Sequence, residues 1–335
     1  MNNQWVLKQR PHGMVKVDDF AKQATPMPVP KDGEVLIRTL YLSFEPAMRG
    51  WLDDVPSYLP PVEIGEVMRA SSVGQVIESK DPNIAKGALV QSMNGWQEYA
   101  VAGPTSLVPP MVLPEGTPPT MPLALMGGTS MTAYFGFLHV GNPQPGQTIL
   151  VSGAAGATGS VVLQIAKIKG CKAVGIAGGK EKCDWLTSLG ADEVIDYKNE
   201  DMAARLAETC PEGVDIFFDN VGAETLEAGI DAMKEGGHII MCGQIANYNA
   251  AEPSPAPRNM FRVISNRLTL QGFILLDYID QFDTATQDLI SWLMEGKLQG
   301  KEDIQDGFDN IPTTLLRLFT GENNGKQLLR LGDPE

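Results

Sequence analysis

Short apolar runs alternate with helix-length segments through the second half of the chain. Apolar or β-branched residues dominate 148–151, 172–177, 193–195, 214–219, 238–242 and 269–275. In the segment after the first of these runs, Val161, Ile165 and Ile168 recur at helical spacing. Strand, crossover and strand in repeated order predict a doubly wound parallel sheet, an α/β Rossmann domain over residues 123–300.

The first part of the chain has a different pattern. Runs such as 34–38 and 72–77 have strand character and are separated by Gly and Pro, while helical periodicity is scarce. We expect a mostly β domain over residues 1–122. The tail, 301–335, returns to short pieces ending in a run at 325–329, and we expect it to close back on this domain. Two domains suit a chain of 335 residues, and substrate would bind between them.

A glycine turn stands between the first strand and the first helix of the second domain. Gly153, Gly156 and Gly159 are spaced G-x-x-G-x-x-G, and the positions between them include Ala155, Ala157 and Thr158. Such a turn lets the backbone bend sharply and approach a pyrophosphate, which the helix N-terminus then binds through its unpaired N–H groups. The segment therefore predicts a dinucleotide site, with an ordinary tight turn as the alternative.

The end of the second strand indicates which dinucleotide binds. NAD-binding units usually place Asp or Glu there to bind the ribose 2′-hydroxyl. Here 172–177 runs into Gly178, Gly179, Lys180, Glu181 and Lys182. Without the carboxylate a 2′-phosphate is not repelled, and lysines can pair with it, so the predicted cofactor is NADP(H). The alternative is that both lysines only solvate the next helix, and Glu181 between them favours that reading.

The composition of the chain limits the classes of molecule that it is expected to bind. Acidic residues outnumber basic ones by 41 to 26, a net charge of −15, which argues against nucleic acid or an anionic membrane as a partner. No run of 18 apolar residues occurs and residues 1–8 lack the apolar stretch of a signal peptide, so we expect a soluble, cytoplasmic protein. The four cysteines and three histidines match no zinc or redox spacing, and we expect no metal site.

Several segments resemble one family. Residues 43–49 (SFEPAMR), 131–136 (MTAYFG), 189–197 (LGADEVIDY) and 218–222 (FDNVG) are similar to signatures of the zinc-independent medium-chain dehydrogenase/reductases. Residues 242–249 (CGQIANYN) and 321–326 (GENNGK) resemble its leukotriene dehydrogenase/prostaglandin reductase branch, which includes plant alkenal double-bond reductases and bacterial curcumin reductases. Glu45 and Ala47 depart from the usual Asp and Tyr, which bears on substrate preference rather than on reaction type.

The resemblance, which covers nearly the whole chain, implies a GroES-like catalytic domain beside the Rossmann domain and assigns roles to residues. Lys182 and Tyr197 fall on positions that hold the 2′-phosphate, and Tyr248 falls on a tyrosine placed over the nicotinamide, where its hydroxyl can bind a substrate carbonyl. Tyr58 resembles a tyrosine that faces the substrate from the first domain. Asn220, Cys242, Phe273 and Asn323 fall near the nicotinamide ribose or the phosphates, and Gly178 and Gly243 complete the predicted cofactor site.

The expected reaction is reduction of the α,β double bond of an enone or enal. Hydride from nicotinamide C4 would add to the β-carbon, and Tyr248 with the cofactor's ribose hydroxyl would stabilise the enolate. The α-carbon is then protonated, by solvent or through Tyr248. The sequence does not determine which substrate is reduced: candidates are 2-alkenals, alkenones, curcumin-like aryl enones and 15-keto-prostaglandin-like ketones.

Two other functions stay open at this point, and so does assembly. An NADPH:quinone oxidoreductase would share the fold and cofactor, although the Tyr248 segment argues mildly against it. A cofactor-binding protein with little turnover is the other alternative. The run 269–275 would form the edge strand of the sheet, and an exposed apolar edge predicts a homodimer.

Overall fold

The middle of the chain forms a parallel sheet flanked by helices. The computed structural model describes residues 1–252, 254–255 and 257–335, which divide into a middle unit, Gly128–Lys301, and a terminal unit, Met1–Gly127 with Glu302–Glu335. The strands of the middle unit are β8 (Thr148–Val151), β9 (Lys172–Ala177), β10 (Glu193–Asp196), β11 (Val214–Asp219), β12 (Met233–Met241) and β13 (Thr269–Gly272). They pair in parallel in the order β10-β9-β8-β11-β12-β13.

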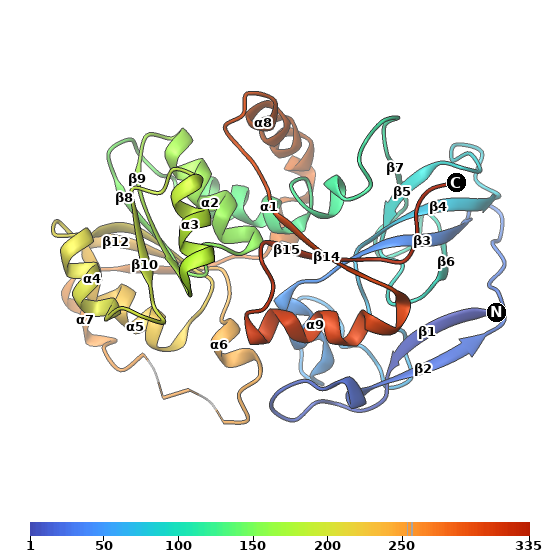
Figure 1. The fold of residues 1–335 in the computed structure, drawn as a ribbon, viewed down its shortest axis with the longest axis horizontal. Helices are drawn as coiled ribbons and strands as arrows, with labels where there is room; N and C mark the ends of the chain where they lie inside the picture. The colour runs from blue at the N-terminus through green and yellow to red at the C-terminus, as the bar shows by residue number, and fades with distance from the viewer. Residues whose placement is uncertain (253, 256) are drawn as a thin grey trace. The chain divides into compact units, whose positions relative to one another are not determined.

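The helices of the middle unit include the expected crossovers between these strands. They are α1 (Gly128–Tyr134), α2 (Ala157–Ile168), α3 (Lys180–Ser188), α4 (Met202–Thr209), α5 (Ala223–Ala232), α6 (Ile245–Tyr248), α7 (Phe261–Ser265) and α8 (Phe282–Met294), with a π-helical turn at Phe135–Val140. Figure 1 shows α2 and α3 on one face of the sheet and α4, α5 and α7 on the other. The predicted doubly wound sheet is confirmed.

The strand order places the switch point of the sheet between β8 and β11. From β8 the chain winds through β9 to β10, then returns to β11 and winds the other way to β13. Because parallel crossovers are right-handed, reversing the direction of winding moves the connecting helices to the opposite face. Ligands of such sheets bind at the carboxyl ends of the strands beside the switch point. The carboxyl ends of β8 and β11 are therefore the place to look for a site.

In the middle unit, β12 and β13 differ most from the sequence prediction. β12 begins at Met233, so His238 lies inside the strand rather than at its start. The pairing of β11 with β12 shifts register after Val214, and Gly236 on the opposing stretch of β12 has a φ of +74°, so β12 accommodates a bulge there. β13 ends at Gly272 rather than at residue 275, because Leu275–Gln281 form a 3₁₀ helix.

The terminal unit is built mostly of antiparallel strands. Its larger sheet has the order β14-β15-β3-β4-β5-β7, β6 also pairs with β3, and β1 pairs with β2. The predicted strands at 34–38 and 72–77 are confirmed as parts of β3, which begins one residue later at Val35, and β4, and both strands extend further along the chain. The strands are β1 (Asn2–Leu7), β2 (Phe20–Thr25), β3 (Val35–Ser43), β4 (Ser72–Ser79), β5 (Leu89–Ser92), β6 (Tyr99–Ala102), β7 (Met111–Val112), β14 (Glu302–Asp306) and β15 (Lys326–Arg330). Short 3₁₀ helices occupy Val17–Asp19, Pro46–Leu52, Met121–Leu123 and Phe308–Asn310.

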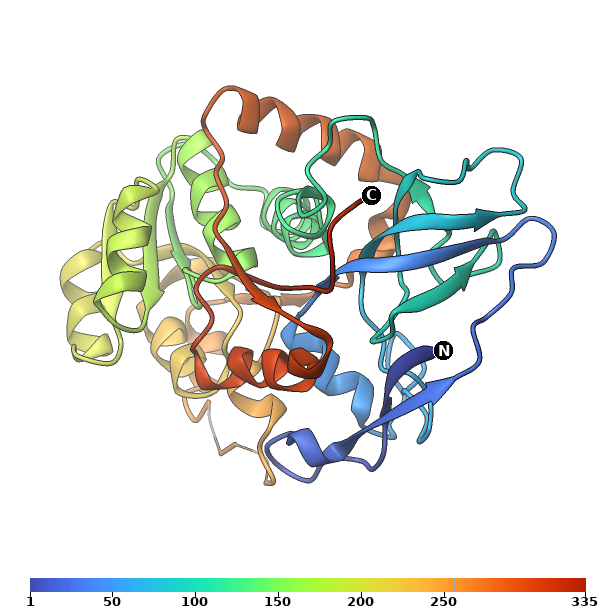
Figure 2. The same cartoon turned by 45° about the vertical axis from the view of Figure 1, so that its right-hand side comes forward.

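The tail of the chain joins the terminal unit through β15, which pairs antiparallel with β3 and places Leu329 opposite Leu42. Figure 2 shows the red tail running beside the blue strand β3. The tail also contains α9 (Ile311–Thr320). The sequence interpretation, which expected only short pieces here, is wrong at this helix. Ile311, Leu315 and Leu318 are buried at helical spacing, so the signal was present in the sequence.

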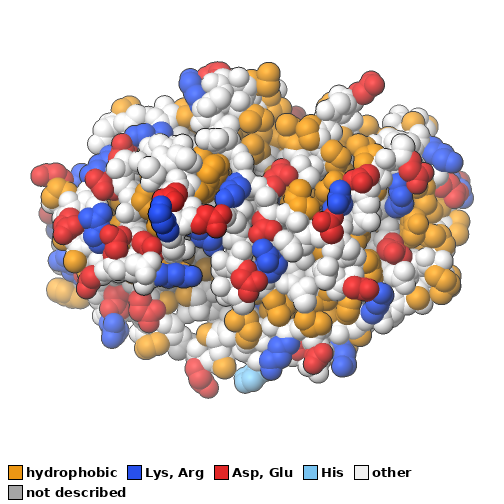
Figure 3. Space-filling model, viewed as in Figure 1, with side chains coloured by type: hydrophobic (Ala, Val, Ile, Leu, Met, Phe, Trp, Pro, Cys, Tyr) orange, Lys and Arg blue, Asp and Glu red, His pale blue; other side chains and the backbone are white. Residues whose placement is uncertain are grey.

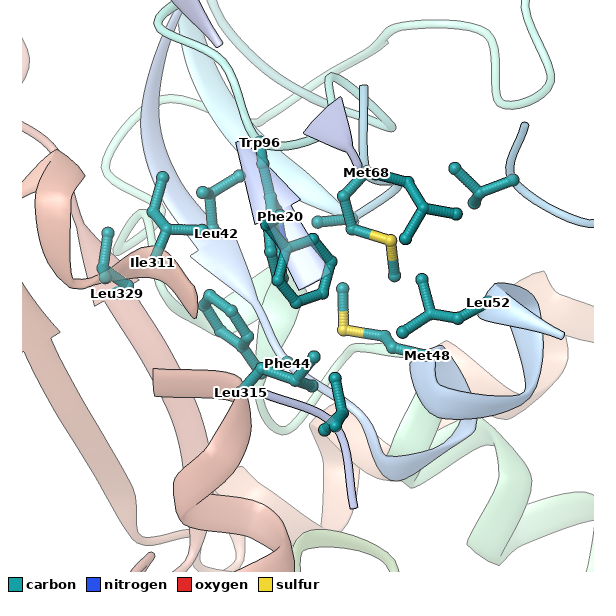
Figure 4. Close-up of a cluster of buried hydrophobic side chains, with 14 of the residues drawn as sticks. Phe20, Leu42, Phe44, Met48, Leu52, Met68, Trp96, Ile311, Leu315 and Leu329 are labelled. Carbon is teal, nitrogen blue, oxygen red and sulfur yellow. The ribbon is translucent and has the colours of Figure 1, made fainter. Parts of the chain in front are cut away.

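A cluster of buried side chains joins distant parts of the terminal unit, as Figure 4 shows. The rings of Phe44 and Trp96 lie 5.9 Å apart between their centroids, and Leu315 and Leu329 from the tail belong to the same cluster. Fully burying side chains of this size contributes roughly 1.5–3 kcal/mol each. The tail is therefore part of the core of this unit rather than an appendage.

Beside this cluster, Lys326 carries a buried charge. Its side chain is 4% exposed, and its Nζ donates to Glu45 Oε1 at 2.7 Å and to the carbonyl oxygen of Phe44 at 3.1 Å. A buried ammonium is costly unless a carboxylate and hydrogen bonds compensate it. Glu45, one of the two departures from the family pattern, thus has a structural role as the counter-ion of Lys326.

The surface carries charges of both signs. Figure 3 shows acidic and basic side chains interspersed over the face drawn there, although the net charge is −15. Over the part of the chain that the structure describes, no helix is long and apolar enough to cross a bilayer.

Candidate active site

The glycine turn follows β8 at the carboxyl edge of the sheet. Gly153 has a φ of +56°, which residues with a side chain rarely adopt. Gly156 is the N-cap of α2, and Gly159 lies in its first turn. A Cβ atom at Gly159 would stand 2.5 Å from the carbonyl oxygen of Gly153. The turn therefore requires glycine at 153 and 159, and α2 begins directly against it.

Ala155, Ala157 and Thr158 complete this turn and the start of α2. Ala155 is buried, whereas Ala157 and Thr158 are half-buried at the beginning of the helix. The first amides of an α-helix have no acceptor within the helix and lie at the positive end of its dipole. The segment is therefore suited to an anion such as a pyrophosphate.

Gly178 and Tyr197 meet at the ends of β9 and β10. A Cβ atom at Gly178 would lie 2.7–2.9 Å from ring atoms and the hydroxyl of Tyr197, so the ring lies directly against the glycine. The backbone amide of Gly179 donates to Asp196 Oδ1 at 2.8 Å, and this bond is the main reason that the pKa of Asp196 is lowered. Asp196 thus caps the loop, and Tyr197 keeps 53% of its surface exposed.

The two lysines of the predicted phosphate site have different surroundings. Lys180 Nζ pairs with Asp184 at 2.6 Å on the exposed face of α3, which is the solvating role that the sequence left open as an alternative. Glu181 pairs with Lys301 at 3.4 Å. Lys182 is half-buried in the first turn of α3, whose N-cap is Gly179 with a φ of +90°. The structure thus gives the two lysines different surroundings, and the role of Lys182 at the 2′-phosphate stays a prediction.

Asn220 follows β11 next to the glycine turn. Its side-chain Nδ2 donates to the carbonyl oxygen of Ser152 at 2.7 Å, and its backbone amide donates to Ser152 Oγ at 2.8 Å. Ser152 Oγ in turn donates to Asp219 Oδ1 at 2.6 Å. These bonds join the end of β8 to the end of β11 at the switch point.

Tyr248 ends the short helix α6, and its hydroxyl is turned back toward the strand end. The hydroxyl oxygen accepts a hydrogen bond from the backbone amide of Gln244 at 3.2 Å. A Cβ atom at Gly243 would lie 3.2 Å from this hydroxyl and 3.2 Å from the carbonyl oxygen of Asn220. Tyr248, Gly243 and Asn220 therefore lie together at the carboxyl ends of β11 and β12.

Cys242 and Gly243 are held by β11. Their backbone amides donate to the carbonyl oxygen of Asp219 at 2.9 and 3.1 Å. Burial and the nearby charge of Asp219 raise the pKa of the Cys242 thiol to about 12. The thiol is thus neutral at physiological pH, and it offers no thiolate for nucleophilic chemistry.

Phe273 lies just beyond β13 and packs into the middle unit. A Cβ atom at Gly136 would collide with its ring, and its centroid lies 6.4 Å from that of Phe218 in an edge-on arrangement. Its position is therefore defined by packing against the π-helical turn and β11.

Tyr58 and Asn323 belong to the terminal unit. The hydroxyl of Tyr58 accepts a hydrogen bond from the indole nitrogen of Trp51 at 3.1 Å, and the side chain is 45% exposed. Asn323 Nδ2 donates to the carbonyl oxygen of Gly325 at 3.0 Å. The other predicted site residues belong to the middle unit, and a shared site with Tyr58 and Asn323 stays a prediction.

Sequence reasoning missed the residues that support this arrangement. Ser152 and Asp219 are fully buried polar side chains at the carboxyl ends of the two strands beside the switch point. Gln244 contributes a backbone amide, which no side-chain pattern could reveal. A usable signal did exist, because a polar residue that directly ends an apolar parallel strand at a switch point is placed where ligands bind.

Among the residues that the structure describes, no group of three or more His, Cys, Asp or Glu side chains is arranged to hold a metal ion.

Comparisons with known proteins identify the family to which this chain belongs. Residues 3–109 match a model described as the N-terminal domain of oxidoreductase, and residues 157–292 match one described as zinc-binding dehydrogenase. The chain is 39% identical to the NADPH-dependent curcumin reductase of Escherichia coli strain K12, over 98% of this chain and 97% of that protein. It is 38% identical to the NADP(+)-dependent 2-alkenal reductase of Nicotiana tabacum, again over 98% and 97%.

A solved structure agrees with these relatives. CurA from Vibrio vulnificus, in complex with NADPH, is similar with a TM-score of 0.93 and 38% identity, covering 99% of this chain and 100% of that one. The chain therefore belongs to the medium-chain dehydrogenase/reductase family, in the zinc-independent branch that contains the curcumin and alkenal reductases.

Proposed function

We propose that this protein uses NADPH to reduce the α,β carbon–carbon double bond of enones and enals. The observation that carries the proposal is the position of the Tyr248 hydroxyl, fixed by the Gln244 amide at 3.2 Å and lying beside Gly243 and Asn220. It stands at the carboxyl edge of the same sheet that bears the glycine turn. The alkenal and curcumin reductases among its relatives support this choice of reaction.

The described residues fit NADPH. The positive φ of Gly153 disfavours a residue with a side chain, and the close backbone at Gly159 leaves no room for one, as a pyrophosphate cradle requires. Gly178, Lys182 and Tyr197 would hold the adenosine 2′-phosphate, Lys182 through its charge. Residues for the nicotinamide half would be Asn220, Cys242, Gly243, Tyr248, Phe273 and, from the terminal unit, Asn323. When bound, NADPH supplies the hydride.

Tyr248 would bind the substrate carbonyl. As the β-carbon is reduced, negative charge develops on the carbonyl oxygen, and an O–H donor aimed at that oxygen stabilises it. The Gln244 amide, by donating to the same hydroxyl oxygen, polarises the O–H bond and makes it a stronger donor. It would also stabilise negative charge on the Tyr248 oxygen if the tyrosine gives its proton to the α-carbon. Tyr58 would contact the substrate from the terminal unit.

A conjugated carbonyl suits this donor set. In an enone the charge is delivered to an oxygen three bonds from the attacked carbon, where one or two neutral hydroxyl donors can stabilise it. Cys242 is held neutral by its surroundings, with a thiol pKa raised to about 12. The site therefore presents neutral donors to a substrate that is itself electrophilic.

The test is loss of reduced-cofactor absorbance with NADPH and with NADH. The panel comprises a short 2-alkenal, an alkenone, curcumin and a quinone, and the products are identified by mass spectrometry. We expect NADPH-preferring turnover that yields the saturated carbonyl compound. Activity on the quinone alone would identify a quinone oxidoreductase, and NADPH binding without turnover on any enone would identify a binding protein. Either result would overturn the proposal.

We further propose that two copies pair along β13. This strand is the edge of the sheet, and Thr269, Gln271 and Gly272 are exposed on it. The preceding helix α7 exposes Phe261 at 74% and Ile264 at 71%. Light scattering should give twice the chain mass of 36.2 kDa, and Ile264→Glu should give the single-chain mass. A wild-type protein of single-chain mass at micromolar concentration would contradict the pairing.

We also propose that the protein is located in the cytoplasm. All four cysteines, Cys171, Cys183, Cys210 and Cys242, are free thiols, as a reducing compartment favours. Cell fractionation followed by immunodetection should find the chain with the cytoplasmic markers, and recovery in the secreted fraction would refute this.

A further inference from the structure

Asp219 is a fully buried carboxylate that the reaction does not use. Its exposed fraction is 0%, and it ends β11 at the switch point of the sheet. Oδ1 accepts from Ser152 Oγ at 2.6 Å and from the Val221 amide at 3.1 Å, while Oδ2 accepts from the Gly222 amide at 3.0 Å. Its backbone carbonyl accepts the amides of Cys242 and Gly243.

The donors around Asp219 define its protonation state. Ser152 Oγ accepts the Asn220 amide at 2.8 Å, so its own proton is the one given to Asp219. Both carboxylate oxygens face N–H or O–H donors, which is the pattern of an ionised carboxylate. Burial raises the pKa of Asp219, and the Ser152, Val221 and Gly222 bonds oppose that rise. The charge is thus retained in the core by three donors.

Asp215, four residues earlier on β11, holds the same three strands at their other ends. Its Oδ2 accepts from the amide of Thr148, the first residue of β8, at 2.7 Å and from Lys234 Nζ, near the start of β12, at 2.8 Å. Asp219 joins β8, β11 and β12 at their carboxyl ends, where ligands of a doubly wound sheet bind, and Asp215 joins them at their amino ends.

We propose that Asp219 is a positioning residue for the nicotinamide half of the cofactor and for the substrate carbonyl, acting through Ser152 on Asn220 and through its own backbone carbonyl on the segment from Cys242 to Tyr248. This rests on the proposed function for the identity of the ligands. The residues proposed for the 2′-phosphate lie elsewhere: Gly178 and Tyr197 follow β9 and β10, and Lys182 lies in the first turn of α3. The hydrogen bonds described for Asp219 involve none of them. The proposal therefore assigns Asp219 to one half of the dinucleotide only.

The test compares Asp219→Asn with Asp215→Asn. Asparagine has nearly the same volume as aspartate. Its NH₂ group, however, must face the backbone N–H of either Val221 or Gly222, and two hydrogen-bond donors then oppose each other. Isothermal titration measures the Kd of NADPH and of adenosine 2′-monophosphate, which carries the 2′-phosphate without the nicotinamide. For Asp219→Asn we expect NADPH to bind about tenfold more weakly and kcat on an enone to fall about 10- to 100-fold. The Kd of the fragment and the ratio of activity with NADPH to activity with NADH stay within twofold of wild type.

Asp215→Asn is the matched control, because it breaks the bonds at the opposite end of the same strands. We expect a lower melting temperature with unchanged Kd values and kcat. If Asp219→Asn does not fold, Ser152→Ala can replace it, because this substitution removes only the bridge between Asp219 and Asn220. We expect the same selective losses of NADPH affinity and kcat, but smaller ones.

Three results would overturn the proposal. They are wild-type values for NADPH binding and kcat in both Asp219→Asn and Ser152→Ala, equal weakening of the fragment and of NADPH, or the same selective loss in Asp215→Asn. Because the NADPH titration needs no turnover, it tests the position of Asp219 even if wild-type protein reduces no enone, so failure of the proposed function would be recognised separately.

Discussion

The ring of Tyr197 lies directly against Gly178: a Cβ atom at position 178 would stand 2.7 Å from the ring. Gly178 follows β9 and Tyr197 follows β10, so two adjacent strands place this pair at one point of the carboxyl edge. The glycine is required by this contact rather than by its backbone conformation. In the proposed cofactor site this pair would face the adenosine end of the dinucleotide.

Gly178→Ala should displace the Tyr197 ring. Overpacking of this kind costs about 1–3 kcal/mol, and we expect a lower melting temperature together with weaker binding of adenosine 2′-monophosphate. Gly50→Ala is the control, because nothing lies within 4 Å of a Cβ atom there. Unchanged fragment binding in Gly178→Ala would show that the Tyr197 ring takes no part in the 2′-phosphate site.

Lys182→Ala should reduce the preference for NADPH over NADH. A charge-assisted hydrogen bond is worth about 1.5–3 kcal/mol, so the ratio of kcat/KM values for the two cofactors should fall about 10-fold or more. Lys180→Ala is the matched control, since Lys180 is 86% exposed on its side chain and pairs with Asp184. Equal effects of the two substitutions would mean that bulk charge, not a specific contact, selects the cofactor.

Tyr248→Phe removes the hydroxyl that the Gln244 amide holds. We expect kcat on an enone to fall about 10²-fold, in the range of a lost acid–base or oxyanion donor, while the Kd of NADPH changes less than threefold. Steady-state kinetics and cofactor titration measure the two effects. A Tyr248→Phe enzyme with wild-type kcat would remove Tyr248 from the chemistry.

Cys242 should resist alkylation in the folded protein. With a pKa of about 12, roughly one thiol in 10⁴ is ionised at pH 8, against about a quarter for an ordinary cysteine, so iodoacetamide should react about 10³-fold more slowly. Because the pKa is raised, the rate should climb tenfold for each pH unit through pH 10 without a plateau. Peptide mass mapping follows Cys242, with urea-unfolded protein as the control. A plateau below pH 9 would contradict this.

Glu45→Gln should destabilise the terminal unit. It leaves the ammonium of Lys326, which is 4% exposed, without a counter-ion, and losing one partner of a buried pair costs about 3–5 kcal/mol. We expect the lower end of that range, because Glu45 keeps 22% of its side chain exposed. Glu302→Gln, at an exposed position without a described ion pair, is the control. Thermal melting that is equal for the two variants would contradict the structural role of Glu45.

Much of this fold follows from local sequence signals. The apolar runs that became β8, β9 and β11 were located to the residue, and the helix α2 followed from the spacing of Val161, Ile165 and Ile168. The boundaries of β12 and β13 were wrong because a bulge at Gly236 and a 3₁₀ helix after Ile274 depend on pairing with neighbours. α9 was overlooked although its buried positions are helically spaced.

The sequence by itself determined the glycine turn and the absence of an acidic residue directly at the end of the second strand, because each is a property of consecutive residues. Only the tertiary structure decided which groups support them. Ser152 meets Asp219 across two strands that are far apart in the chain, and Lys326 meets Glu45. Such partners are fixed by strand order and by the need of buried polar groups for hydrogen bonds, and neither is written in any single segment.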